Sequence, residues 1–422
     1  MKQFIELGLN KEMLDHINKL GFEEPTDVQE KTIPLVLEGK DVIVGSATGS
    51  GKTIAFGAPI LQNCHSKGGI QALILTPTRE LAEQIQGVLR TISRLKVNAI
   101  YGGVSINQQF KELERAEIVV GTPGRLLDHL ERNTIDLSNV KYLVLDEADR
   151  MLDMGFLDDV NKIIGRCPKQ KQMLLFSATI PPEVAQISKK FMNSPTKITI
   201  SNLVDPKKMN QVYYDIQSKL KFSLLVHLLQ KEKTGLVMVF CNSRRYVDVV
   251  ARNLNSLKID ALGIHGGLSQ AQRTRVLQKF KSPTPFVLVC TDVAARGLDI
   301  PSVSHVYNYD LPQDPKQYIH RIGRTARAGK SGEIINLLSQ KDYEYFSNVL
   351  REYNVQIKKQ EKPFIEELKI PEEKKFGGDR QGYSQERRGP RGNTDGRRPR
   401  PRGEGGDKPF VKKRFNRSNE FK

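Results

Sequence analysis

No apolar run in the sequence approaches the roughly 20 residues that a membrane-spanning helix needs. The N-terminus, MKQFIELGLN, lacks the charged, apolar and small-residue pattern of a secretory signal. The 422 residues include only four cysteines, Cys64, Cys167, Cys241 and Cys290. They form no CxxC pair, so the sequence indicates neither a zinc site nor a disulfide framework. We therefore expect a soluble cytoplasmic protein of two or three domains, with no membrane contact and with buried, reduced thiols.

Basic residues outnumber acidic ones by 66 to 48, and the excess is concentrated at the C-terminus. Residues 374–422 hold 16 basic and 6 acidic residues, so this segment carries more than half of the chain's net charge of +18. From about Glu372 the composition is dominated by Gly, Arg and Pro, which cannot bury enough apolar surface to fold. We predict a disordered basic tail over 372–422 that binds a polyanion such as nucleic acid; a solvated tail that only aids solubility is the alternative.

Short β-branched and aliphatic runs alternate with longer stretches of helical periodicity along the rest of the chain. The expected strands form two series, 41–44, 72–75, 117–120, 142–145 and 173–176, then 236–240, 261–264, 286–290, 305–309 and 333–338. This repetition predicts an α/β fold with two parallel sheets, each joined by right-handed crossovers and covered by helices on both faces. The polar stretch 201–211 is the expected hinge, which gives predicted domains at 1–205 and 206–371.

Polar motifs follow five of the strands expected in the first half. They are GSATGSGKT after 41–44, TPTRE after 72–75, GTPGR after 117–120, DEAD after 142–145 and SAT after 173–176. Ligands of open parallel sheets bind beyond the carboxyl ends of the strands. We therefore expect the five motifs to share one edge of one sheet.

Residues 46–53, SATGSGKT, have the pattern of a phosphate-binding loop, although Ser46 stands where the strict form has its first glycine. Residues 323–331, GRTARAGKS, have the same spacing, so spacing alone does not choose between them. The first segment follows an apolar strand and runs into a potential helix, whose N-terminal amides favour phosphate. The second is followed within a few residues by a predicted strand, so we assign the nucleotide to 46–53.

The charges in these motifs predict the roles of their side chains. Lys52 is expected to neutralise the β and γ phosphates, and the Thr53 hydroxyl to bind Mg²⁺, while the amides of residues 49–53 cradle the oxygens. A carboxylate at the same sheet edge can hold the magnesium ion. We expect Asp146 to be that ligand and Glu147 to orient and deprotonate the attacking water.

Eight motifs in order resemble those of the DEAD-box ATP-dependent RNA helicases, a family of helicase superfamily 2. They are GFEEPTDVQ (21–29), SATGSGKT (46–53), PTRELA (77–82), TPGR (122–125), DEAD (146–149), SAT (177–179), ARGLD (295–299) and HRIGRTAR (320–327). The resemblance covers nearly everything from Phe4 to about residue 370. It implies two tandem RecA-like domains, with ATP in the cleft between them and RNA lying across both.

For ATP, the resemblance implies that Phe22 stacks on adenine, Gln29 reads its edge and Thr26 supports the motif. The expected phosphate loop comprises Ser46, Ala47, Thr48, Gly49, Ser50, Gly51, Lys52 and Thr53, and Asp299 is the candidate for a ribose hydroxyl. Coupling of hydrolysis to RNA is assigned to Asp149, Ser177, Thr179 and His320. Arg324 and Arg327 are spaced one helical turn apart, so we expect them to share one face of a helix. The resemblance implies that they are arginine fingers for the γ phosphate.

The residues at the RNA-contact motifs of the family are Thr78, Arg79, Gly103, Thr122, Gly124, Arg125, Asn242, Ser243, Arg244, Gly266 and Thr291. Hydroxyl, amide and guanidinium groups suit phosphate and sugar, so the binding is expected to be independent of sequence. The tail resembles the arginine- and glycine-rich extensions of several such helicases and is expected to contact RNA and possible ribonucleoprotein partners.

The resemblance implies a monomeric, RNA-stimulated ATPase that uses ATP and Mg²⁺ to separate or remodel RNA locally. Two alternatives stay open from the residues alone. One is a non-enzymatic RNA-binding protein with a vestigial nucleotide site, which the presence of every expected catalytic residue disfavours. The other is a DNA helicase or translocase, which only contacts to the 2′-hydroxyl would distinguish, so the choice of RNA rests on the resemblance.

Overall fold

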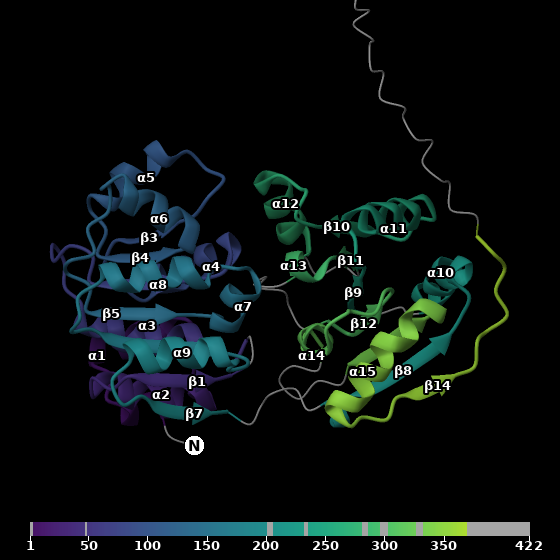
Figure 1. Cartoon of the computed structure of the whole chain (residues 1–422), viewed down its shortest axis with the longest axis horizontal. Helices are drawn as coiled ribbons and strands as arrows, with labels where there is room; N and C mark the ends of the chain where they lie inside the picture. Colours follow the sequence, from purple (N-terminus) through teal and green to yellow (C-terminus); the bar gives the residue numbers. More distant parts are fainter. Residues whose placement is uncertain are drawn as a thin grey trace, which may run out of the picture. The chain divides into compact units, whose positions relative to one another are not determined.

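The computed structural model describes residues 3–46, 49–200, 206–231, 235–280, 286–295, 303–325 and 332–368. These residues form two separate seven-stranded sheets in which every strand pairing is parallel (Figure 1). The α/β class with two parallel sheets is therefore confirmed.

The first sheet has the strand order β3-β4-β2-β5-β6-β1-β7. Its strands are β1 (Val42–Gly45), β2 (Ala72–Leu75), β3 (Val97–Ile100), β4 (Ile118–Gly121), β5 (Tyr142–Leu145), β6 (Gln172–Ser177) and β7 (Thr196–Thr199). Its helices are α1 (Lys11–Lys19), α2 (Asp27–Leu37), α3 (Lys52–Asn63), α4 (Arg79–Thr91), α5 (Ile106–Leu113), α6 (Pro123–Glu131), α7 (Ala148–Asp153), α8 (Leu157–Arg166) and α9 (Pro182–Phe191).

Successive strand residues face opposite sides, and each side packs against its own helices. Val42 and Val44 lie in a core with α1 to α4, whereas Ile43 lies in a second core with α5 to α9. Both layers of helices are visible in Figure 1. Because both faces are covered, the strands read as continuous apolar runs, which is why the sequence predicted them well.

The second sheet has the strand order β10-β11-β9-β12-β13-β8-β14. Its strands are β8 (Asn210–Asp215), β9 (Leu236–Phe240), β10 (Ala261–Ile264), β11 (Phe286–Cys290), β12 (His305–Asn308), β13 (Glu333–Leu338) and β14 (Lys358–Gln360). Its helices are α10 (Lys221–Lys231), α11 (Arg244–Ser256), α12 (Gln270–Phe280), α13 (Asp292–Ala295), α14 (Pro315–Ile322) and α15 (Tyr343–Tyr353). Helices α10 and α11 pack on one face, and α12 to α15 pack on the other.

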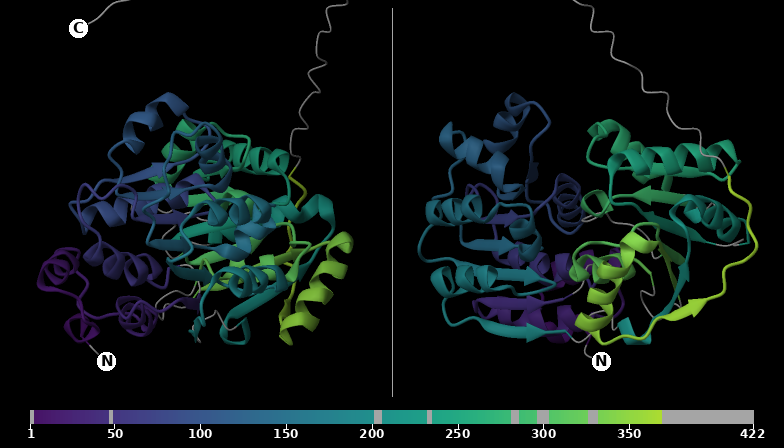
Figure 2. Two further views of the ribbon diagram at one scale, coloured as in Figure 1. Left: turned by 60° about the vertical axis from the view of Figure 1, so that its left-hand side comes forward. Right: turned by 45° about the vertical axis from the view of Figure 1, so that its right-hand side comes forward.

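Four strands were not predicted, namely β3, β7, β8 and β14. Strand β7 has the sequence TKIT with one buried residue, and the three residues of β14 are all exposed. Both lie at sheet edges, as the outer position of β14 in Figure 2 illustrates, so neither carries the apolar run of a central strand. Strand β8 begins at Asn210, inside the hinge predicted at 201–211; residues 201–205 and the whole of the tail over 372–422 lie outside the described residues.

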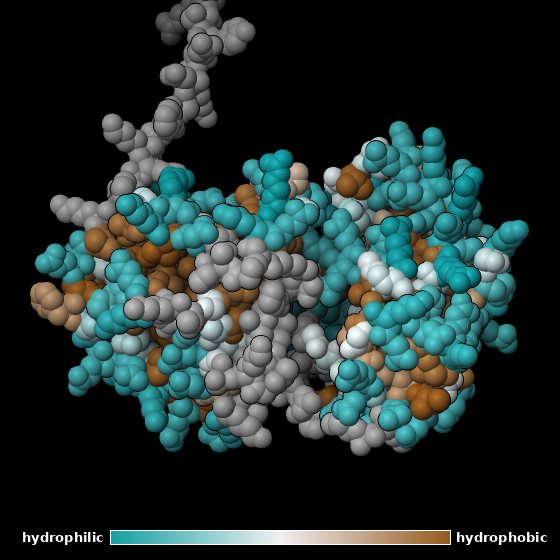
Figure 3. Space-filling view, turned by 180° about the vertical axis from the view of Figure 1, so that it is seen from behind, coloured by the Kyte–Doolittle hydropathy of each residue, from teal (hydrophilic) through white to brown (hydrophobic). Residues whose placement is uncertain are grey.

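The four cysteines are free thiols, and the predicted burial holds for Cys167, Cys241 and Cys290 but not for Cys64, which is half-buried. Burial raises the pKa of the Cys167 thiol to about 11, consistent with an unreactive core side chain. Hydrophilic side chains cover most of the face shown in Figure 3, and the apolar atoms visible there form separate patches. Across the residues that the structure describes, no helix is both long and apolar enough to span a bilayer.

Candidate functional site

Three of the predicted motifs follow neighbouring strands of the first sheet. Strand β6 pairs with β1 on one side and with β5 on the other, with Gly45 opposite Ser177 and Leu145 opposite Leu175. SATGSGKT follows β1, SAT begins at the end of β6, and DEAD follows β5. The motifs TPTRE and TPGR follow β2 and β4 of the same sheet. All five therefore lie at its carboxyl edge, as predicted.

The loop before α3 has the backbone of a phosphate cradle. Gly49 and Gly51 have φ angles of 81° and 89°, in the left-handed region, and Gly51 is the N-cap of α3. The buried hydroxyls of Ser46 and Ser50 have no hydrogen-bond partner among the described residues. Free hydroxyls and helix N-terminal amides suit the oxygens of a phosphate chain. Ala47 and Thr48 lie outside the described residues.

Thr26 and Gln29 brace this loop. The Thr26 hydroxyl donates to the Ser50 carbonyl at 2.8 Å, and Gln29 Nε2 donates to the Gly51 carbonyl at 3.1 Å. Gln29 Oε1 also accepts from the Thr26 amide at 2.9 Å, which completes a capping box at the start of α2. These two bonds use one N–H and one lone pair of the Gln29 amide and leave the other N–H and the other lone pair unused by them. Phe22 is 42 % exposed and so has a ring face available for stacking.

Lys52 and Asp146 form the centre of the site. Lys52 Nζ lies 3.7 Å from Asp146 Oδ1, and their side chains are only 8 % and 3 % exposed. Burial raises the pKa of Asp146 to about 6, although the nearby Lys52 ammonium opposes the rise. A second cation such as Mg²⁺ would favour the ionised carboxylate, so this side chain fits a metal ligand. Thr53, the other predicted ligand, is in the first turn of α3.

Glu147 has a left-handed backbone, with φ 53° and ψ 52°, and precedes the first residue of α7. Its Oε2 is 2.5 Å from Nη1 of Arg150, one helical turn further on. Burial alone would raise the pKa of Glu147, but the cations of Arg150 and Lys52 outweigh it and hold this pKa below its ordinary value. Glu147 is therefore an ionised acceptor near neutral pH. Arg150 was not predicted from the sequence, although its spacing of three residues from Glu147 was a visible signal.

Asp149 joins the DEAD and SAT motifs. Its Oδ2 accepts from both the backbone N–H and the hydroxyl of Thr179, at 2.8 and 2.9 Å. Its own N–H donates to the Ser177 hydroxyl at 3.0 Å. Three of the four residues expected to couple hydrolysis to RNA are therefore in direct contact. The fourth, His320, is on α14, beside the second sheet.

The RNA-contact candidates of the first domain lie at helix starts and turns of one sheet edge. Thr78 and Thr122 are the N-caps of α4 and α6, and Gly124 is in the first turn of α6. Gly103 has a φ of 86°, and a side chain there would meet the guanidinium of Arg79. The Arg125 guanidinium donates to Gln109 Oε1 at 2.9 Å and to the Val104 carbonyl at 3.1 Å.

The candidates of the second domain follow β9, β10 and β11. Asn242 and Ser243 come after β9, Arg244 begins α11, Gly266 follows β10 and Thr291 follows β11. Arg321, which the sequence analysis did not single out, links two of these segments. Its guanidinium makes paired contacts with Asp292 at 2.6 and 2.7 Å and donates to Asn242 Oδ1 at 3.1 Å. Arg321 is 1 % exposed, so its role is to hold these segments together.

The HRIGRTAR motif is described only in part. Helix α14 ends at Ile322, so the expectation that Arg324 lies on a helix is wrong; it follows in a turn, where its carbonyl accepts from Val303 N at 3.1 Å. Gly323 is the C-cap of α14 and has an ordinary φ of −65°, and strand β13 begins at Glu333, two residues after Ser331, which leaves no room for a helix after the segment. This supports the rejection of 323–331 as a phosphate loop. Arg327 and Asp299 lie outside the described residues.

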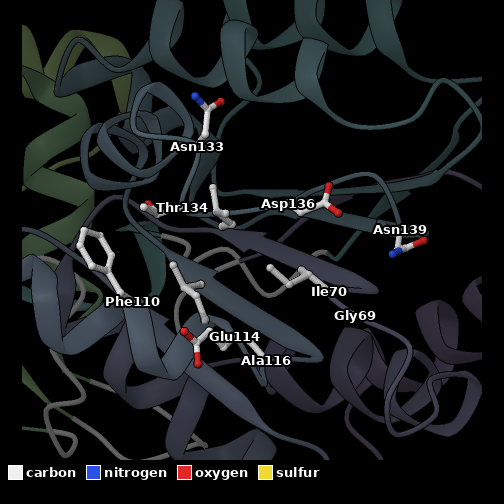
Figure 4. Close-up of a pocket in the computed structure, with 11 residues that line it drawn as sticks. Gly69, Ile70, Phe110, Glu114, Ala116, Asn133, Thr134, Asp136 and Asn139 are labelled. Atoms are coloured by element: carbon white, nitrogen blue, oxygen red, sulfur yellow. The ribbon is translucent and has the colours of Figure 1, made fainter. Parts of the chain in front are cut away.

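A surface pocket of about 470 Å³ lies away from this site, near the amino ends of β2 and β4 (Figure 4). Gly69 and Ile70 precede β2 and Ala116 precedes β4, whereas the motifs follow the carboxyl ends of these strands. Among the described residues, no cluster of three or more His, Cys, Asp or Glu side chains could hold a metal.

Comparison with known proteins identifies the family. Residues 26–187 match the DEAD/DEAH box helicase model, and residues 220–329 match the helicase conserved C-terminal domain model. ATP-dependent RNA helicase CshA of Listeria monocytogenes is 48 % identical over 351 residues, which are 82 % of this chain and 68 % of that protein. DEAD-box ATP-dependent RNA helicase CshA of Geobacillus kaustophilus is 44 % identical, over 87 % of this chain and 80 % of that protein.

Solved structures agree. S. cerevisiae Dbp5 bound to RNA and ADP BeF3 has a TM-score of 0.76 and 33 % identity, over 85 % of this chain and 96 % of that chain. Mss116p bound to ssRNA and AMP-PNP has a TM-score of 0.76 and 30 % identity, over 86 % of this chain and 79 % of that chain. The two parallel sheets are thus tandem RecA-like domains, and the chain belongs to the DEAD-box family of ATP-dependent RNA helicases.

Proposed function

We propose that this DEAD-box RNA helicase hydrolyses ATP on the first domain and uses the reaction for local, sequence-independent separation or remodelling of RNA duplexes and ribonucleoproteins. The observation that carries the proposal is the contact between the catalytic and coupling motifs. Asp149, two residues after the candidate base Glu147, accepts two hydrogen bonds from Thr179. A change at the phosphate site therefore has a direct route to the segment that follows β6.

ATP would be held by the loop 46–53, with Lys52 on its β and γ phosphates and with Phe22 and Gln29 at its adenine. Mg²⁺, if bound by Asp146 and Thr53, supplies charge neutralisation of the phosphate oxygens. Three observations support the fit: the unpartnered Ser46 and Ser50 hydroxyls, the left-handed glycines, and the buried Lys52 and Asp146 side chains.

Glu147 is proposed to orient the attacking water and to take up its proton. Its carboxylate is kept ionised by Arg150 and Lys52, so it can accept a hydrogen bond near neutral pH. Arg324 and Arg327 are proposed to stabilise the charge that develops on the γ phosphate, and Asp299 to bind the ribose. Because these residues belong to the second domain, efficient hydrolysis requires both domains to engage the nucleotide.

RNA is proposed to bind through its backbone along the carboxyl edges of both sheets, with the tail over 372–422 adding affinity. The hydroxyl N-caps Thr78, Thr122 and Ser243 and the flanking amides are donors suited to phosphate. We assign the recruitment of ribonucleoprotein partners to the tail because residues 374–422, with 16 basic and 6 acidic residues, carry more than half of the chain's net charge of +18. The cytoplasmic location and monomeric state stay predictions, which cell fractionation and light scattering would test.

A phosphate-release assay tests the proposal and separates the alternatives. The full chain should hydrolyse ATP slowly alone and several-fold faster with single-stranded RNA, and it should separate a short RNA duplex only when ATP is present. DNA of the same sequence is the matched control. Absence of ATPase with and without RNA would favour the non-enzymatic alternative, and equal stimulation by DNA would favour the DNA helicase.

A further inference from the structure

We infer that Gln109, in α5, is a positioning residue for RNA binding. It is in none of the eight motifs that relate the chain to its family. The inference rests on the proposed function and deepens it, because it assigns the arrangement of two RNA-contact segments to one buried amide. These segments are the turn 101–105, which carries Gly103, and the start of α6, which carries Thr122, Gly124 and Arg125.

The Gln109 side chain is only 3 % exposed, and both ends of its amide group are hydrogen-bonded. Its Nε2 donates to the Tyr101 carbonyl at 3.1 Å, at the residue where β3 gives way to the glycine turn. Its Oε1 accepts from Arg125 Nη1 at 2.9 Å. One amide group therefore bridges the turn and α6, which are about 20 residues apart along the chain.

Arg125 holds the other end of the same turn. Its Nη2 donates to the Val104 carbonyl at 3.1 Å. The turn is thus fixed at Tyr101 by Gln109 and at Val104 by Arg125, with Gly103 between the two anchors. Gly103 has a left-handed φ of 86°, and a Cβ there would lie within 2.6 Å of Arg79 Cζ. A shift of the turn would therefore also displace Arg79 from its present position.

His129, in α6, fixes the direction of the Gln109 amide. Its Nε2 lies 3.1 Å from Gln109 Oε1, and its Nδ1 lies 2.8 Å from the Thr134 hydroxyl. Burial and the Arg125 charge lower the pKa of His129, so the ring is neutral at physiological pH. Because Gln109 Oε1 is an acceptor, the His129 proton belongs on Nε2. The Thr134 hydroxyl, which also lies 3.1 Å from the His129 carbonyl, then has Nδ1 as its nearer acceptor, at 2.8 Å.

This arrangement leaves one orientation for the amide. A turn of 180° would point the Gln109 NH₂ group at two donors, Arg125 and His129, and its oxygen at the Tyr101 carbonyl. The described hydrogen bonds of the Gln109 side chain go to Tyr101 in the glycine turn and to Arg125 and His129 in α6. The Gln109 amide therefore sets the spacing between the turn 101–105 and the start of α6, the two segments proposed to contact the RNA backbone. An apolar side chain of equal volume could not set this spacing, because it makes no hydrogen bonds.

The test is Gln109→Leu, which nearly preserves volume and removes all three hydrogen bonds. Each such bond contributes roughly 0.5–1.5 kcal/mol, so we expect the RNA concentration for half-maximal ATPase to rise by about three- to tenfold. The kcat at saturating RNA and the KM for ATP should stay within about twofold of wild type, because neither depends on the turn once RNA is bound.

Gln86→Leu is the matched control. Gln86 is in α4, and its Nε2 donates to the Val97 carbonyl at 3.0 Å, at the opposite end of β3 from Tyr101. Like Gln109, it donates its amide N–H to a backbone carbonyl, but no described hydrogen bond joins its side chain to an RNA-contact segment. Gln86→Leu removes one such bond and Gln109→Leu removes three, so we expect the larger loss of thermal stability for Gln109→Leu. At a temperature where both variants are fully folded, the weaker RNA affinity should be confined to Gln109→Leu.

Equal RNA affinity for the two variants would overturn the inference, and so would a KM for ATP that rises in parallel with the RNA constant. If Gln109→Leu does not fold, Gln109→Glu against Gln86→Glu gives the second test. The carboxylate introduced by Gln109→Glu would still accept from Arg125 but could no longer donate to the Tyr101 carbonyl. RNA affinity should therefore fall in Gln109→Glu and not in Gln86→Glu. Absence of RNA-stimulated ATPase in the wild type would instead contradict the proposed function.

Discussion

Asp149 binds Thr179 twice through one carboxylate oxygen, with Oδ2 accepting from the Thr179 amide at 2.8 Å and from its hydroxyl at 2.9 Å. The Asp149 amide in turn donates to the Ser177 hydroxyl at 3.0 Å. Hydrogen bonds to a charged acceptor are about twice as strong as neutral ones. The end of β6 and the start of α7 therefore form one unit, although 28 residues separate Asp149 from Ser177.

Thr179→Val should uncouple ATP hydrolysis from strand separation. The substitution keeps the side-chain shape and the backbone N–H bond but removes the hydroxyl bond to Asp149. A bond of this kind contributes roughly 1.5–3 kcal/mol, so we expect RNA unwinding to slow at least about tenfold while RNA-stimulated ATPase changes about threefold or less. Thr199→Val, at an exposed position of edge strand β7, is the control. Parallel loss of both activities would argue against a coupling role.

Glu147→Gln should bind ATP and RNA but turn over slowly. The amide retains the size of the side chain and can still accept from Arg150, but it is a far weaker base than the carboxylate. General-base catalysis typically contributes about 10²–10⁴-fold, so we expect kcat to fall by that order, with nucleotide affinity nearly unchanged. Glu131→Gln, at the exposed end of α6, controls for the lost charge. Normal ATPase by Glu147→Gln would remove Glu147 from its proposed role.

Gly51→Ala tests the link between the adenine motif and the phosphate loop. A Cβ at Gly51 would lie 2.6 Å from Gln29 Nε2 and 3.0 Å from the Thr26 hydroxyl, at a φ of 89° that costs an L-residue roughly 1–2 kcal/mol. We expect ATP affinity to fall at least about tenfold in a titration with a fluorescent nucleotide. Gly323→Ala, in the segment with the same motif spacing but a φ of −65°, should leave nucleotide affinity unchanged. A loss of nucleotide affinity in Gly323→Ala but not in Gly51→Ala would indicate that the nucleotide binds at 323–331 instead.

The sequence predicted the central strands and the motif residues because both carry local signals. A strand buried on both faces has to be an apolar run, and a phosphate loop has to combine glycines with a lysine before a helix. Lys52 and Asp146 were therefore found from pattern alone, and the parallel topology brings them within 3.7 Å.

The supporting residues had no such signal. Arg321 meets Asp292, 29 residues away, and Asn242, 79 residues away, and neither pairing leaves a periodic pattern in the sequence. Gln29 was predicted to face adenine, but its bond to the Gly51 carbonyl depends on how α2 packs against α3. Edge strands β7 and β14 were missed because solvent on one side removes the need for apolar residues.

Deletion of residues 374–422 should weaken RNA binding and flatten its dependence on salt. The segment carries 16 basic and 6 acidic residues, and each phosphate contact that is lost reduces the slope of log K against log salt by about 0.7 for single strands. ATP affinity without RNA should not change. RNA affinities measured at several salt concentrations for both chains provide the check, and equal values would contradict an RNA-binding tail.

A buried ion pair stabilises the second domain. Lys221 Nζ lies 2.7 Å from Asp342 Oδ2, and both side chains are almost fully buried. Lys221 also donates to the Tyr309 carbonyl at 2.9 Å, and the Ser339 hydroxyl and amide donate to Asp342. Burial alone would raise the pKa of Asp342, but the Lys221 ammonium and the Ser339 donors hold this pKa below its usual value.

Asp342→Asn should destabilise the fold by roughly 3–5 kcal/mol near neutral pH, because it leaves the buried Lys221 charge without its partner. Since the folded-state pKa of Asp342 is below the unfolded value of about 3.9, its stabilisation is fully present above that pH and is lost as the pH falls through the folded value. The difference in urea-induced unfolding between wild type and variant should therefore shrink below about pH 4. Asp260→Asn, which removes an exposed ion pair with Lys279, should change stability by about 1 kcal/mol or less. A difference that stays constant down to pH 2 would show that the Asp342 charge contributes nothing to stability.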